Sequence, residues 1–88
     1  MKILLSGNLR RYAAYEDEIE VEASSVSSAI ERLVERFPEL NRVLYDAEGK
    51  FRSVHRVYLN SEVLASGDTN HPTRPSDELG ILTAIAGG

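Results

Sequence analysis

The most regular pattern in the chain is an apolar stripe with helical spacing. Beginning at residue 26, its members follow at i, i+3, i+4, i+7, i+8 and i+11, the spacing of one helix face packed on a core. Ser25 precedes the stripe as the predicted N-cap, and Pro38 ends the helix or bends the chain just after it. We therefore expect an amphipathic helix of about three turns. The stripe consists of Val26, Ala29, Ile30, Leu33, Val34 and Phe37.

Two segments before this helix have the patterns of strands. Residues 2–6 form a short apolar run, and residues 18–23 alternate strictly between glutamates and apolar residues. Such alternation indicates a strand with one face on a core and the other in water. We interpret the glutamate row as a solvated face, and the alternative is a docking surface for a basic partner. Gly7-Asn8 predicts a turn, and Arg10 to Tyr12 belong to the connection between the two strands.

The segment after the helix has a shorter and more broken pattern. It predicts a further helical turn at residues 40–44, a loop at 46–50, a third strand at 55–59 and a short fourth strand at 62–64. Gly67, Pro72 and Pro75 indicate that residues 65–78 are mostly loop. His55 and His71 lie far apart in the sequence without a matching carboxylate pattern, so we predict two surface histidines and no metal site.

The chain closes with a final strand. Leu79, Ile81 and Thr83 alternate with Gly80, Leu82 and Ala84, and the run is apolar enough for a buried strand. The order is thus strand, strand, helix, strand, short strand, strand. A single helix must bury its stripe across one face of the sheet, and the helix provides the only long crossover. We therefore predict an α+β fold with a mixed sheet, in which the first and last strands are parallel neighbours at the centre.

Composition narrows the range of functions. Eighty-eight residues are enough for one domain, and the absence of cysteine excludes disulfides, thiolate metal sites and a cysteine nucleophile. The net charge of -4 disfavours nucleic-acid binding. No apolar run has the length of a membrane span, and Met1-Lys2 leads directly into a strand pattern, so we expect a cytoplasmic protein without membrane association.

The chain ends in Gly87-Gly88, directly after the last strand. Two terminal glycines occur by chance in about 0.5% of chains, so the ending calls for an explanation other than a frayed tail or linker. The tip's only reactive group is the α-carboxylate of Gly88. Two residues without Cβ fit a crevice too narrow for any side chain, where a partner enzyme could hold this carboxylate against the α-phosphate of ATP.

The element order, the segment Asp77-Glu78-Leu79-Gly80-Ile81-Leu82 and the ending Ala84-Ile85-Ala86-Gly87-Gly88 resemble the β-grasp (ubiquitin-like) sulfur carriers of the MoaD/ThiS/CysO type. The resemblance extends over nearly the whole chain, although only the ending is specific. The long connection before Val57-Tyr58-Leu59-Asn60 is most similar to the branch that serves cysteine biosynthesis. The resemblance implies one β-grasp domain over residues 1–88 with a flexible C-terminal Gly-Gly tail.

The resemblance also implies a carrier and not an enzyme. A MoeB/ThiF-like adenylating enzyme would use ATP and Mg on Gly88, a sulfur donor would convert the acyl adenylate to a thiocarboxylate, and an acceptor synthase would take the sulfur. Ile85, Ala86 and Gly87 would guide the tail, and Leu82 would belong to a docking surface. No cofactor would be bound by the chain itself. The alternatives are a molybdopterin-synthase small subunit, a ubiquitin-like protein modifier, and a β-grasp interaction module without chemistry.

Overall fold

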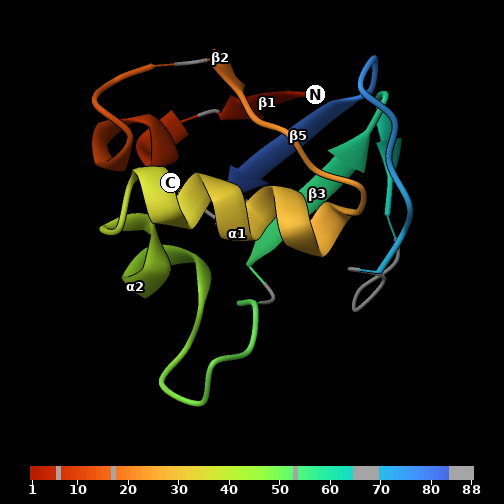
Figure 1. Ribbon diagram of the computed structural model, residues 1–88. Helices are drawn as coiled ribbons and strands as arrows, with labels where there is room; N and C mark the ends of the chain where they lie inside the picture. The colour runs from red at the N-terminus through yellow and green to blue at the C-terminus, as the bar shows by residue number, and fades with distance from the viewer. Residues whose placement is uncertain (6, 17, 53, 65–69, 84–88) are drawn as a thin grey trace.

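The computed structural model describes residues 1–5, 7–16, 18–52, 54–64 and 70–83 (Figure 1). Within these residues the chain forms five strands and three helical segments. In chain order they are β1 (Lys2–Leu5), the 3₁₀ helix η1 (Gly7–Tyr12), β2 (Glu18–Glu20), α1 (Val26–Arg36), α2 (Leu40–Leu44), β3 (His55–Leu59), β4 (Glu62–Val63) and β5 (Glu78–Thr83).

The strands form one mixed sheet in the order β2-β1-β5-β3-β4. The first and last strands, β1 and β5, are parallel neighbours at its centre, with Ile3 opposite Leu79 and Leu5 opposite Ile81. The remaining neighbours pair antiparallel. Helix α1 lies across one face of this sheet (Figure 1). The predicted α+β architecture, a β-grasp sheet with one main helix packed across it, is therefore confirmed.

The core lies between α1 and the sheet. The four stripe residues from Val26 to Leu33 are at most 1% exposed, while Val34 and Phe37 pack partly buried against them. Helix α2 adds Leu40 and Leu44, both fully buried. The sheet contributes every second residue, as expected when one face is covered. The inner-face residues are Ile3, Leu5, Ile19, Leu59, Leu79 and Ile81.

Helix α1 begins where the sequence predicts. Ser25 accepts a hydrogen bond from the backbone N–H of Ser28 at 3.2 Å, and the Ser28 hydroxyl accepts one from the Ser25 N–H at 3.0 Å. This reciprocal capping box satisfies two N–H groups that an uncapped helix would leave without partners. The Arg32 guanidinium contacts Glu35 at 2.9 Å, but both side chains are exposed, so the pair contributes little. Burial of the apolar stripe, rather than local charge pairing, holds the helix in place.

Two expectations need correction. His55, predicted at the surface, is only 7% exposed, and its Nε2 lies 2.7 Å from the Val43 carbonyl oxygen. His55 has the same strand parity as Val57 and Leu59, and so it points to the covered face. The connection after β1 is not merely a turn. It contains η1, whose Leu9 is buried in the core together with Ala13, the residue directly after the helix. Arg10 and Arg11 interrupt this apolar spacing and hide the element in the sequence.

None of the helices in the described ranges is long and apolar enough to cross a membrane.

Candidate docking face

The sheet face opposite α1 carries the side chains of each strand that do not point into the core. Because side chains alternate along a strand, Leu4 and Tyr58 point away from the core that their neighbours Ile3 and Leu59 fill. The register brings three central strands together on this outer face: Leu4 lies opposite Gly80, and Gly80 lies opposite Tyr58. Leu4 and Tyr58 are only partly buried. Two apolar side chains of the outer face, Leu4 and Tyr58, thus lie over the middle of the sheet.

A hollow of about 390 Å³ lies at this place, and we call it the outer-face groove. Gly80 in β5 contributes no side chain to it. A Cβ added at Gly80 would lie 3.7 Å from the Tyr58 Cβ, an ordinary contact, so the glycine leaves space without being sterically required. The lining residues are Leu4, Leu5, Tyr58, Ser61, Glu78, Gly80, Ile81 and Leu82, of which Leu5 and Ile81 keep their side chains buried in the core.

Leu82 joins the outer-face groove near the end of β5. It pairs in register with Arg56, which is exposed, and is itself partly buried. Its parity is opposite to that of the buried Leu79 and Ile81, as expected for an outward position. β5 ends at Thr83, opposite the first residue of β3. Of the predicted site residues, Leu82 is the one that the structure describes; Ile85, Ala86, Gly87 and Gly88 lie outside the described residues.

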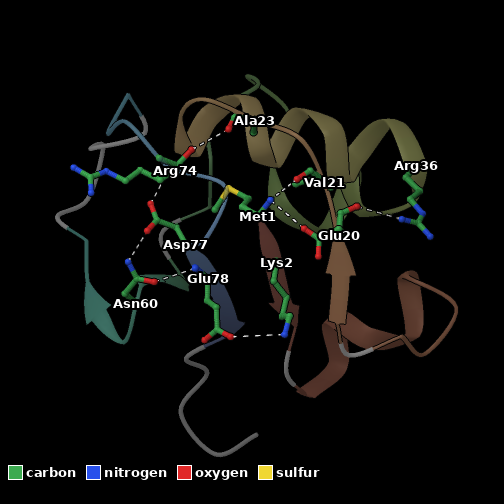
Figure 2. A network of polar contacts seen from close by, with 11 residues as sticks. Met1, Lys2, Glu20, Val21, Ala23, Arg36, Asn60, Arg74, Asp77 and Glu78 are labelled. Carbon is green, nitrogen blue, oxygen red and sulfur yellow. Dashed lines mark hydrogen bonds and ion pairs between the residues drawn. The ribbon is translucent and has the colours of Figure 1, made fainter.

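The other end of the groove is fixed by a polar network around Asn60 (Figure 2). Asn60 and Ser61 both have left-handed backbone angles, with φ of 52° and 72°, as a tight hairpin turn requires. The Asn60 amide donates to Asp77 at 2.9 Å, and its carbonyl oxygen accepts the backbone N–H of Glu78 at 3.0 Å. This ties the β3–β4 turn to the start of β5 and so positions Ser61 and Glu78 at the groove.

The same network lowers the pKa of the Asp77 carboxyl group. Asp77 accepts the Asn60 hydrogen bond and a second one from the backbone N–H of Arg74 at 2.8 Å (Figure 2). Both bonds favour the ionised carboxylate, so they hold the pKa of Asp77 below its ordinary value of 3.8. Among the described residues, no three histidine, aspartate or glutamate side chains gather as a metal site would require.

Sequence reasoning identified Leu82 but not the remainder of the groove. Leu4 carried a usable signal, since a leucine between two inward residues of a central strand must point outward. Tyr58 lies between Val57 and Leu59 and was open to the same inference. Gly80 gave no signal of its own, because an empty position becomes a hollow only when the register of three strands is known.

The fold and its groove define a β-grasp, ubiquitin-like protein with an apolar depression on the open sheet face. A family model described as the ThiS family matches residues 3–88. The chain therefore belongs to the ThiS family and is a β-grasp carrier of the ThiS/MoaD type. Proteins of this family are small carriers rather than catalysts. A search of well-characterised proteins gave no significant match.

Solved structures agree with this assignment. The chain is similar to one in the Amycolatopsis orientalis BexX/CysO complex, with a TM-score of 0.85, 27% identity, and 99% of this chain and 98% of that one covered. SAMP1 from Haloferax volcanii has a TM-score of 0.83 at 24% identity, with 100% and 98% covered. Mycobacterium tuberculosis CysO has a TM-score of 0.83 at 20% identity, with 96% and 98% covered. The latter two likenesses concern the fold alone.

Proposed function

We propose that this chain is a sulfur carrier whose reacting group is the α-carboxylate of Gly88. A MoeB/ThiF-like enzyme adenylates that carboxylate with Mg-ATP, a sulfur donor converts the adenylate to a thiocarboxylate, and an acceptor synthase receives the sulfur. The observation that carries the proposal is the family match, which continues through the last strand and the Gly-Gly ending to residue 88. The chain itself is a protein substrate and holds no cofactor in this scheme.

The chemistry of the tip favours this role. Gly87 and Gly88 lack Cβ atoms, so they can follow a narrow crevice to a nucleotide where a larger residue would collide. Ile85 and Ala86 guide the tail into that crevice. Ordering four tail residues costs about 4–8 kcal/mol, because each fixed backbone costs about 1–2 kcal/mol. Such a cost keeps docking brief, which suits a carrier that passes from one enzyme to the next.

Docking must therefore draw on the folded body as well as on the tail. The outer-face groove lies against β5, the last strand before the tail, and Leu82 belongs to both. We assign the groove to an apolar side chain of the activating enzyme, with Leu82 as its main contact. β5 is a central strand of the sheet and runs parallel to β1. An enzyme bound at the groove is therefore held in one orientation relative to the end of β5.

We further propose cysteine, or a related sulfur metabolite, as the product that receives the sulfur. Support comes from the similarity to the chain in the BexX/CysO complex, at 27% identity over nearly the full length of both proteins. The alternative within the same chemistry is a molybdopterin-synthase small subunit. Supplying the thiocarboxylated chain to the two classes of acceptor enzyme distinguishes them, since only one will consume it.

ATP–pyrophosphate exchange with the cognate activating enzyme tests the first step. One extra C-terminal residue should abolish exchange, because it moves the carboxylate by more than the 1 Å that can cost about a hundredfold in rate. Gly88→Ala keeps the carboxylate but adds a Cβ, and should slow exchange severely. As the matched control, an extension that a protease removes back to Gly88 should restore exchange. Full exchange by the uncut extended chain would contradict the proposal.

A further inference from the structure

The chain has few amino groups. Eight of its ten basic residues are arginines, and only Lys2 and Lys50 are lysines, although lysine is among the commonest residues in proteins. Arginine keeps its charge at any physiological pH and does not act as an amine nucleophile. The α-amino group of Met1 is the third amine. This matters for a protein with an activated C-terminal carboxyl group, because amines attack activated acyl groups and form amides.

Two of the three amines are held by the glutamates of neighbouring strands (Figure 2). The Met1 ammonium donates to the Val21 carbonyl oxygen at 2.6 Å and lies 3.1 Å from Glu20, and Met1 is buried. The Lys2 ammonium lies 3.2 Å from Glu18 and 3.9 Å from Glu78. The hydrogen bond and charge of Glu18, together with Glu78, raise the pKa of Lys2 and so reduce its neutral, nucleophilic form.

The third amine has a different environment. Lys50 is exposed and lies within the loop between α2 and β3. This loop extends from the body of the molecule (Figure 1). The loop backbone is fixed, since the Lys50 N–H donates to Asp46 at 3.0 Å and the Asp46 N–H donates to the Lys50 carbonyl oxygen at 2.8 Å. None of the ion pairs among the described residues includes the Lys50 ammonium. Hydrogen bonds therefore hold the Lys50 backbone in place, while its amine has no carboxylate partner among the described residues.

We propose that Lys50 is the acceptor lysine of this chain, at which the activated Gly88 carboxyl group of a second copy forms an isopeptide bond. The inference rests on the proposed activation of Gly88. The Lys50 nitrogen attacks the Gly88 carbonyl carbon, a C–N bond forms, the C–O bond to AMP breaks, and the amine gives up one proton to water. The step involves no oxidation or reduction. The glutamates of β2 and β5 direct acylation away from Met1 and Lys2 and towards the loop.

The test uses the full chain with a thioester at Gly88, prepared by intein cleavage, so that no activating enzyme is needed. After incubation at mildly alkaline pH, linked dimers are digested with trypsin and mapped by mass spectrometry. Trypsin does not cut between Arg74 and Pro75, so the expected product is fragment 57–88 joined through Gly88 to Lys50 within fragment 43–52. Lys50→Arg keeps the positive charge and should lose the product. Lys2→Arg is the matched control and should leave the yield unchanged.

A link mapped mainly to Lys2 or Met1 would overturn the inference. So would an undiminished dimer yield from Lys50→Arg, or hydrolysis of the thioester without any link. Because the thioester replaces the adenylate, these results do not depend on whether an enzyme activates Gly88. Failure of pyrophosphate exchange would refute the proposed carrier function, whereas a wrongly placed link would refute only the assignment of Lys50.

Discussion

Leu82→Asp tests whether the outer-face groove docks the activating enzyme. Burying a whole leucine side chain contributes about 1.5–3 kcal/mol, and Leu82 is already partly covered, so docking gains roughly half of that. Aspartate loses this gain of about 1 kcal/mol and places an unpaired carboxylate at an apolar contact, which costs about 2–3 kcal/mol more. We therefore expect docking to weaken by about 3–4 kcal/mol, or about 100- to 1,000-fold at 1.4 kcal/mol per factor of ten.

The assay is ATP–pyrophosphate exchange as a function of carrier concentration, with a urea melt of each variant. The expected result is a raised KM for the Leu82→Asp chain and a cooperative urea melt that loses only about 1–2 kcal/mol, because the part of Leu82 that the fold covers is lost as well. Tyr15→Asp is the matched control: it introduces the same charge at a side chain that is 69% exposed, and its left-handed backbone, with φ of 62°, tolerates aspartate. Equal KM values for the two variants would refute docking at the groove. An unfolded Leu82→Asp chain would instead identify Leu82 as a core residue.

Three further outcomes are expected. Leu33→Ala removes a fully buried side chain and should cost about 2–5 kcal/mol, lowering Tm by about 10–25 °C, whereas exposed Glu35→Ala should cost well under about 1 kcal/mol; equal effects in a urea melt would contradict the assigned helix face. Gly80→Ala fills the floor of the groove without a steric clash, so it should raise KM in pyrophosphate exchange and leave the melt unchanged; an unaltered KM would exclude the floor from docking. Because the Asn60 hydrogen bond lowers the pKa of Asp77, that carboxylate stabilises the fold above its ordinary pKa of 3.8 and loses this effect as the pH falls through the lower folded value. Asp77→Asn should therefore flatten this part of the acid-unfolding curve measured by circular dichroism, and an unchanged curve would contradict it.

The sequence predicted those parts of the fold that depend on periodicity. The stripe from Val26 to Phe37 has one covered face, and the alternation in β5 separates buried Leu79 and Ile81 from Leu82. The central parallel pair followed from topology, because a single crossover helix leaves few other ways to cover the sheet. These predictions succeeded because burial of one face places apolar residues at a regular spacing, and this spacing is visible in the sequence.

The remainder depended on tertiary packing. The 3₁₀ helix is too short for a period to be visible, and Arg10 and Arg11 stand among its residues. His55 was misplaced because a polar residue type outweighed its strand parity, although the Val43 carbonyl satisfies its ring nitrogen. The protection of Met1 and Lys2 arises from the register of β1 with β2 and β5, which a linear sequence does not display.

Intact-protein mass spectrometry reads the chemical state of the C-terminal carboxylate itself. The wild-type chain is incubated with the cognate activating enzyme, ATP and a sulfur source, and the C-terminal peptide is then sequenced by fragmentation. A carrier should show replacement of one oxygen by sulfur, located at Gly88. An unchanged mass, with an activating enzyme shown to be competent on another carrier, would show that Gly88 is not thiocarboxylated and would refute the carrier function.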